Sequence, residues 1–161
     1  MDERPAFHGF DPSAKVARES RYKRPESVLV VVYTVAGEVL VLRRCQPADF
    51  WQSVTGSLHW GESDPLITAR RELREETGLG DAVTVLPCGI VNRFPILPPW
   101  RNRYAPEVTE NVEHVFRVEL PEPCTILLNP DEHSELAWLP RAVAAGRVSS
   151  WTNREAILQL P

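Results

Sequence analysis

Residues 56–79, GSLHWGESDPLITARRELREETGL, decide the fold of this chain because they join a glycine-containing loop to a helix with clear limits. Asp64 and Pro65 are typical of an N-cap and a first helical position. Gly78 is typical of the left-handed residue that ends a helix. The sequence therefore predicts a helix over residues 65–77.

Three glutamates on this helix carry the strongest chemical signal. Glu72 lies three residues before Glu75 and four before Glu76, so the carboxylates project from one side of the helix. Mg²⁺ prefers carboxylate oxygens and takes further ligands from substrate phosphates, which predicts a divalent-metal site used in phosphate chemistry. The alternative is a solvated acidic face, but Arg71 is placed to hold Glu75. The expected cation is Mg²⁺, with Mn²⁺ as the alternative.

The same residues resemble the Nudix hydrolase signature, which is a Gly, five residues, a Glu, seven residues, and then Arg-Glu-hydrophobic-any-Glu-Glu-any-Gly-hydrophobic. Gly56 begins the match, and glycine there would let backbone approach a ligand closely. Eight residues, not seven, separate Glu62 from Arg71. The extra residue precedes the helix, so it lengthens the loop without rotating the helical glutamates against each other, and the role of Glu62 stays open.

The rest of the chain predicts one domain of α/β (α+β) class. At 161 residues and 43% hydrophobic composition, it is long enough for one core. Residues 1–21 are polar and predict an extended or partly ordered arm, and residues 22–161 form the domain. Strands are expected at 28–35, 39–42, 51–55, 82–86, 88–94, 112–120 and 136–139, and further helices at 140–145 and 152–160. The resemblance implies an α/β/α sandwich with a mixed sheet between helices.

Charge and cysteine content exclude several other classes. A net charge of −4 and a pI near 5.6 argue against a nucleic-acid-binding face. Cys45, Cys88 and Cys124 are widely spaced and predict neither a disulfide framework nor a zinc site. The longest apolar run, 28–36, is shorter than the ~20 residues of a membrane span. We therefore expect a cytoplasmic protein with no membrane partner.

Segments outside the signature resemble one subfamily, the bacterial dihydroneopterin triphosphate pyrophosphatases, also described as dATP pyrophosphohydrolases. These segments are Tyr-Lys-Arg-Pro at 22–25, Asp-Phe-Trp-Gln-Ser-Val-Thr-Gly at 49–56, Arg-Tyr-Ala-Pro at 103–106 and Ser-Trp-Thr-Asn-Arg at 150–154. The resemblance implies a Mg²⁺-dependent enzyme of folate biosynthesis that releases pyrophosphate and a monophosphate from dihydroneopterin triphosphate or (d)NTPs such as dATP.

A triphosphate substrate needs cations beyond the metal, and a flat ring needs an apolar slot. The proline-rich loop at 95–106 supplies Arg101 as a further basic group and Trp100 as a candidate ring wall, whereas Phe50, Trp51 and Trp138 are typical of a core. For each basic residue the alternative is an ordinary surface charge. The expected substrate contacts, some placed by the subfamily pattern, are Lys23, Arg44, Thr55, Gly56, Arg103 and Tyr104.

A carboxylate is expected to orient or deprotonate the attacking water beside the cation. Glu113 matches a position where the subfamily has an additional acidic residue, so it is a candidate for this role or for a further metal ligand; the alternative is an exposed strand residue. His59 and His114 are weaker candidates for the base. The expected catalytic residues are Glu75, Glu113 and Arg71, and the expected metal ligands are Glu72, Glu75, Glu76 and Glu113.

Two other functions compete with this hypothesis. Within enzymes, the alternative is hydrolysis of ADP-ribose or a nucleoside-diphosphate sugar. In another class, it is a non-catalytic nucleotide sensor on the same fold. The clustered acids argue against the sensor, because a pure binding module has little need of them.

Overall fold

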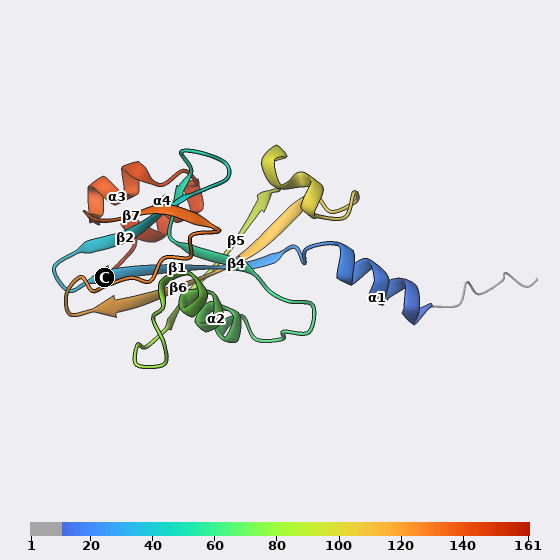
Figure 1. The fold of residues 1–161 in the computed structure, drawn as a ribbon, viewed down its shortest axis with the longest axis horizontal. Helices are drawn as coiled ribbons and strands as arrows, with labels where there is room; N and C mark the ends of the chain where they lie inside the picture. Colours follow the sequence, from blue (N-terminus) through green and yellow to red (C-terminus); the bar gives the residue numbers. More distant parts are fainter. Residues whose placement is uncertain (1–10) are drawn as a thin grey trace, which may run out of the picture.

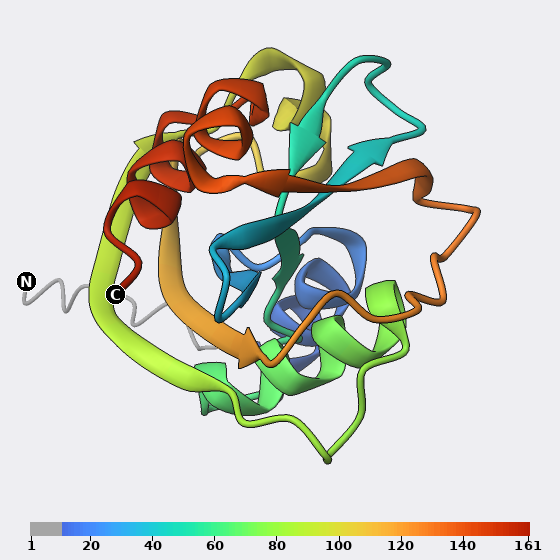
Figure 2. The ribbon, with the colours of Figure 1, turned by 90° about the vertical axis from the view of Figure 1, so that its left-hand side faces the viewer.

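The computed structural model describes residues 11–161 and has a central mixed sheet with helices on both faces (Figures 1 and 2). The strands are β1 (Glu26–Thr34), β2 (Glu38–Arg44), β3 (Trp51–Gln52), β4 (Val54–Ser57), β5 (Leu86–Pro95), β6 (Glu110–Leu120) and β7 (His133–Pro140). The helices are α1 (Pro12–Arg21), α2 (Pro65–Thr77), the 3₁₀ helix η1 (Pro98–Arg103), α3 (Arg141–Arg147) and α4 (Trp151–Leu158).

Strand β1 is the centre of the sheet. The order of hydrogen-bonded strands in the sheet is β3-β2-β1-β6-β5, and in addition β4 pairs with β1 and β7 pairs with β2. The β1–β6 pair is parallel and the other pairs are antiparallel, so the sheet is mixed. β2 pairs with β1 beside the hairpin turn, where Tyr33 faces Val39, whereas β4 pairs with the first half of β1. The sheet therefore splits where β2 and β4 diverge.

Two apolar layers cover the two faces of the sheet. Successive strand residues point to opposite faces, so Val28 and Val30 pack with Leu73 of α2, whereas Leu29 packs with Ile157 of α4. Figure 2 shows α2 on one side of the sheet and α3 and α4 on the other. This arrangement confirms the predicted α/β fold with a mixed sheet between helices.

The expected extended arm differs from the structure in its described part. Pro12–Arg21 is a helix, capped by the Asp11 side chain, which accepts a hydrogen bond of 2.9 Å from the Ser13 amide. Asp11-Pro12 is the same start signal as Asp64-Pro65 of α2, but the polar sequence after it has no apolar stripe to draw attention to a helix. Figure 1 shows α1 extending away from the sheet. The first ten residues lie outside the described part.

The strand predicted at 82–86 is wrong, because residues 81–85 form turns and coil and β5 begins at Leu86. Val85 is buried and Val83 packs against the α2-side core, so the apolar pattern there reflects packing of a loop. The last helix, expected over 152–160, spans Trp151–Leu158. Ser150 is the N-cap of α4, and its hydroxyl accepts from the Asn153 amide at 3.2 Å.

Among the described residues, helices that combine enough length with enough apolar character to cross a bilayer are not found.

Candidate active site

Helix α2 has the limits that the sequence predicts. The Asp64 carboxylate accepts from the Leu66 amide at 2.9 Å, and Gly78 ends the helix with φ of 75°. The helix packs closely on β4 at Gly56, where an added Cβ would lie 1.9 Å from Cδ of Glu72. Glycine at position 56 therefore leaves room for the Glu72 side chain against β4. Gly56 also lines the pocket, but its closest neighbour is Glu72.

Glu76 lies at the centre of a group that could hold a cation. Its carboxylate is fully buried; Oε2 accepts from the Thr55 amide at 3.4 Å, and Oε1 has no hydrogen-bond partner. Glu76, Glu132 and His133 each offer one ligand atom, and these atoms lie within 4.8 Å of one another. The buried His133 Nδ1 also lacks a partner. A buried carboxylate oxygen without a partner, close to two further possible ligands, is what a divalent cation would satisfy, so these residues fit one.

Burial changes the protonation of these groups. Burial, with Glu75 and Glu132 nearby, raises the pKa of Glu72 to about 7, although Arg71 opposes the change. Burial and then Glu72 raise the pKa of Glu76 well above its usual value. Burial lowers the pKa of His133 to about 4, which keeps its ring neutral and able to coordinate a metal. A bound cation would offset the cost of bringing these carboxylates together.

The three helical glutamates share a side of α2 but differ in exposure. Glu76 is fully buried and Glu72 nearly so, whereas the side chain of Glu75 is 51% exposed. Glu72 and Glu75 line the pocket. Among the described residues, the close group of possible ligands contains Glu76 with Glu132 and His133, and neither Glu72 nor Glu75.

Arg71 holds several acidic groups rather than Glu75 alone. Its Nε lies 2.9 Å from Glu62 Oε1, its Nη1 lies 2.7 Å from Glu72 Oε1, and its contact with Glu75 is longer, at 3.4 Å. Nη2 also donates to the carbonyl of Ser57 at 3.1 Å. The expected pairing with Glu75 is therefore the weakest of these carboxylate contacts, and Arg71 joins α2 to the preceding loop and to β4.

Glu62 retains a defined place despite the longer spacing. Its carboxylate accepts from the Thr68 hydroxyl at 2.6 Å and the His59 amide at 2.8 Å, in addition to Arg71. The Arg71 guanidinium holds the pKa of Glu62 down at about 2. These bonds close the loop onto the first turns of α2, so Glu62 is fixed beside Arg71 although the loop is one residue longer than in the signature.

The predicted basic residues come together in one pocket. Lys23, Arg44 and Arg103 all line it. Burial lowers the pKa of Lys23, and Arg103 lowers it further; burial and Arg103 act in the same sense on the pKa of Arg44. Three cations in one pocket, of which Arg103 lowers the pKa of the other two through its like charge, form a site suited to phosphates. Arg101 instead donates to the carbonyls of Ala105 and Pro106, so it holds its own loop.

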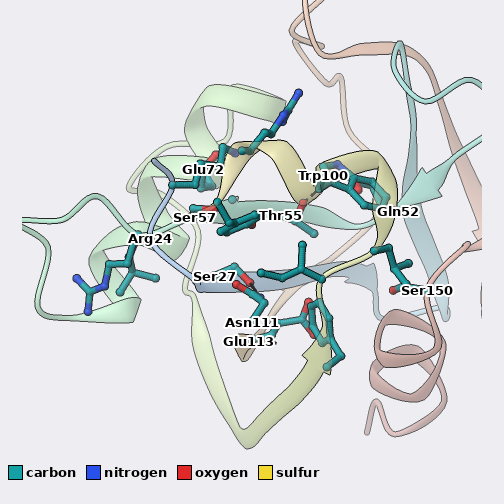
Figure 3. A pocket seen from close by; sticks show the side chains of 18 of the residues that line it. Arg24, Ser27, Gln52, Thr55, Ser57, Glu72, Trp100, Asn111, Glu113 and Ser150 are labelled. Atoms are coloured by element: carbon teal, nitrogen blue, oxygen red, sulfur yellow. Dashed lines mark hydrogen bonds between the residues drawn. The ribbon is translucent and has the colours of Figure 1, made fainter. Parts of the chain in front are cut away.

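The pocket has a cavity volume of about 1080 Å³ and aromatic walls. Trp100 and Tyr104 line it, as expected for a ring slot, and Figure 3 shows Trp100 beside Gln52 at its edge. Phe50, expected in the core, instead lines the pocket and meets Trp100 edge to face with ring centroids 5.1 Å apart. Trp138, by contrast, packs against the α2-side core.

The two candidate histidines differ in position. His59 is exposed at the pocket rim, with Nδ1 3.7 Å from Glu62. His114 Nε2 lies 2.8 Å from Glu26, which also pairs with Arg24. His114 is not among the pocket-lining residues, so the structure gives it no access to a substrate there.

Glu113 lies away from the Glu76 group. Residues of odd number on β6 face α3 and α4, as Val115 does, whereas Phe116 faces α2. Glu113 therefore projects from the face opposite α2, and its carboxylate accepts from Asn92 Nδ2 at 3.2 Å. It is buried, not exposed, and it lines the same large pocket.

Comparisons with known proteins show the family. A family model for the NUDIX domain matches residues 23–159. This chain is a Nudix hydrolase. The dihydroneopterin triphosphate diphosphatase of Escherichia coli K12 is 41% identical over 146 residues, covering 88% of this chain and 95% of the relative. That of Haemophilus influenzae is 38% identical over 141 residues, covering 85% and 87%. The solved E. coli dihydroneopterin triphosphate pyrophosphohydrolase superposes with a TM-score of 0.80 and 42% identity, over 86% of this chain and 96% of that one.

Several residues of this Nudix hydrolase site escaped the sequence reasoning. Glu132 and His133 come from the segment that enters β7, which pairs with β2, so that His133 lies opposite Arg44. The polar run Asn-Pro-Asp-Glu-His at 129–133 was the available signal. The pocket residues Ser27 and Asn111 lie at the polar starts of β1 and β6, next to Glu26 and Glu110, and the sequence carries no signal that separates them from these polar neighbours.

Proposed function

We propose that this Nudix hydrolase cleaves dihydroneopterin triphosphate to the monophosphate and pyrophosphate with Mg²⁺ bound. One observation carries the proposal. A single cavity brings Glu72, Glu75 and Glu132 together with three cations and an aromatic wall, and Glu132 in turn lies close to the buried Glu76 and His133. This combination suits a polyphosphate attached to a flat ring, and both curated relatives named above are diphosphatases of that substrate.

The cation would be held at α2, where we propose Glu72, Glu75 and Glu76 as ligands together with Glu132 and His133. Nudix proteins are typically metal-dependent, and the acidic cluster that such dependence needs is present. When bound, the cation supplies charge stabilisation at the phosphorus and acidifies a water. Glu75 is the least constrained of the acids, so its exposed carboxylate is our candidate for accepting the proton of that water.

The substrate would be held by basic side chains at its phosphates and by aromatic side chains at its ring. Lys23, Arg44 and Arg103 bind the phosphate oxygens, and Thr55 lines the pocket beside them. Tyr104 borders the slot, and its phenol hydrogen-bonds with Ser57. Arg71 also lines the pocket, and we assign it the role of positioning Glu72 because of its 2.7 Å contact with that carboxylate.

Hydrolysis with identified products tests the proposal. The purified protein is assayed with Mg²⁺ on dihydroneopterin triphosphate, dATP and ADP-ribose. We expect pyrophosphate and a monophosphate from the triphosphates, with higher kcat/KM on dihydroneopterin triphosphate than on dATP. A higher kcat/KM on ADP-ribose, with AMP and ribose phosphate as products, would establish the competing function. Glu76→Gln serves as the inactive control, so that a contaminating phosphatase is detected.

Two further expectations accompany the function. As an enzyme of the Nudix family, this protein is not expected to act as a non-catalytic sensor. Its cytoplasmic location stays a prediction from composition, consistent with the free thiols of Cys45, Cys88 and Cys124.

A further inference from the structure

A row of polar side chains crosses the sheet on the face opposite α2. Strand register places Asn92 of β5 opposite Glu113 of β6, Glu113 opposite Ser27 of β1, and Ser27 opposite Ser57 of β4. Residues opposite each other point to the same face of a sheet, so the row is continuous across four strands. Asn111 lies two residues before Glu113 and shares its face.

Part of this row forms the floor of the pocket. Figure 3 shows Ser27, Asn111 and Glu113 together on one side, with Glu72 on the other and Thr55 and Ser57 between them. All three floor residues line the cavity, and both Asn111 and Glu113 are buried. Buried polar groups are costly unless they are hydrogen-bonded. The hydrogen-bond acceptors that these side chains leave unused therefore indicate a polar ligand.

The floor presents hydrogen-bond acceptors. Asn111 Nδ2 donates to Ser27 Oγ at 2.7 Å, which leaves the buried Asn111 Oδ1 without a partner. The Glu113 carboxylate accepts from Asn92 and hydrogen-bonds with Thr152, but a carboxylate has further lone pairs to offer. Burial raises the pKa of Glu113, and these two bonds oppose the change.

An aromatic side chain borders the acceptors. Phe94 of β5 lies opposite Asn111 in the strand register and lines the same cavity. Trp100 of η1 lines it as well. A planar ring bound beside Phe94 would therefore place one edge against Asn111 and Glu113.

We propose that Asn111 and Glu113 select the ring of the substrate by accepting hydrogen bonds from a 2-amino-4-oxo-pyrimidine edge. This inference rests on the proposed function. That edge carries an amino group beside a ring N–H, and both are donors. Adenine offers an amino group beside an unprotonated ring nitrogen, which would face an acceptor. A site built to accept two hydrogen bonds rejects an analogue that cannot donate both.

The role proposed for Glu113 differs from that of a metal ligand or a general base. Glu113 projects from the sheet face opposite α2, and it is absent from the close group formed by Glu76, Glu132 and His133. Its two hydrogen-bond partners are neutral side chains, so its carboxylate is held in place without a counter-ion. Glu113 is thus a specificity residue for the ring, and the same edge occurs in a pterin and in guanine.

The experiment compares three triphosphates with the Glu113→Gln variant, which keeps the side-chain size and replaces one acceptor by a donor. The substrates are dihydroneopterin triphosphate, dGTP and dATP. We expect kcat/KM on the two substrates with the 2-amino-4-oxo edge to fall about 10- to 100-fold relative to that on dATP. Glu110→Gln, an exposed glutamate on the same strand, is the matched control and should leave these ratios unchanged.

A binding measurement without catalysis separates the two proposals. Fluorescence titration with neopterin monophosphate in EDTA should show weaker binding to Glu113→Gln than to the wild type. If the wild type hydrolyses dGTP but not dihydroneopterin triphosphate, the proposed function fails, while a fall in the dGTP-to-dATP ratio still supports ring selection. An equal loss on all three substrates, relieved by added Mg²⁺, would overturn the inference and make Glu113 a metal ligand.

A second variant covers the case in which Glu113→Gln unfolds. Asn111→Ala removes the unpartnered acceptor and should change the substrate ratios in the same direction. Unchanged ratios in a folded Asn111→Ala protein, together with unchanged neopterin monophosphate binding, would overturn the inference.

Discussion

The two ends of the pocket bury carboxylates in different ways. At the α2 end, burial and then Glu72 raise the pKa of Glu76, and Glu76 keeps an oxygen without a partner. At the other end, Glu113 is a single carboxylate held by two neutral groups. Mutually repelling acids need a cation, whereas a solitary acid with neutral partners can accept from a neutral ligand. We therefore propose that the pocket has a phosphate end at α2 and a ring end at Glu113.

The largest expected effect is at the phosphate end. Glu76→Gln should lower kcat about 10³-fold or more, because it removes charge from the centre of the proposed cation site. Thermal unfolding in EDTA should show a protein at least as stable as the wild type, since a buried and partly unpartnered carboxylate has been neutralised. Near-normal activity of Glu76→Gln at low millimolar Mg²⁺ would contradict the assignment of Glu76 to the cation site. The proposed difference between the two ends of the pocket would then be lost.

Metal binding without substrate tests the residues that tertiary structure adds to the site. Mn²⁺ or Mg²⁺ at about 100 times its Kd should stabilise the wild type by about 2.7 kcal/mol, seen as a rise in Tm. Glu132→Gln should diminish this rise. Glu122→Gln, a change at an exposed acid in the segment after β6, is the control and should keep this rise. An equal rise in Tm for all three proteins would place the cation elsewhere.

The loop that carries Glu62 gives a pH-dependent prediction. The folded pKa of Glu62 is about 2, below its usual 4.5, so its ionised form stabilises the fold above pH 4.5 and this stabilisation is lost as pH falls toward 2. The groups that face it are Arg71, Thr68 and His59. We expect Glu62→Gln to lower the free energy of unfolding by about 2 kcal/mol at pH 7, with a smaller difference at pH 3.

Urea unfolding of the wild type and Glu62→Gln at the two pH values measures this difference. Glu38→Gln, an exchange outside the site, corrects for the general change in charge. A difference that grows toward low pH would have the opposite sign and would exclude the Glu62–Arg71 pair as its source.

The smallest expected effect is that of Arg71→Lys. A guanidinium reaches Glu62, Glu72 and the Ser57 carbonyl at once, whereas an ammonium is a point charge that cannot keep all these contacts. We expect kcat to fall about 10-fold, with partial recovery at high Mg²⁺ because the ligand Glu72 is less well placed. Arg70→Lys, on the exposed side of α2, is the control. A rise in KM alone, insensitive to Mg²⁺, would show that Arg71 contacts the phosphates.

Local sequence rules predicted much of this molecule and failed in recognisable places. The limits of α2 follow from Asp64-Pro65 and Gly78, because capping acts within a few residues. The strand predicted at 82–86 failed because an apolar pattern reports burial, and Val85 is buried from a loop. Arg71 was paired with Glu75 on helical spacing alone, whereas the closer carboxylates are Glu72 beside it and Glu62 in the preceding loop.

The sequence by itself determined the family, the acidic helix and the basic residues that line the pocket, because these depend on residue types at short, fixed spacings. Tertiary structure decided which groups meet. The β2–β7 pairing brings His133 opposite Arg44, and the register of β5, β6 and β1 sets Asn92, Glu113 and Ser27 in a row. Strand pairing joins residues that lie far apart in the chain, and a one-residue change of register would turn each side chain to the other face.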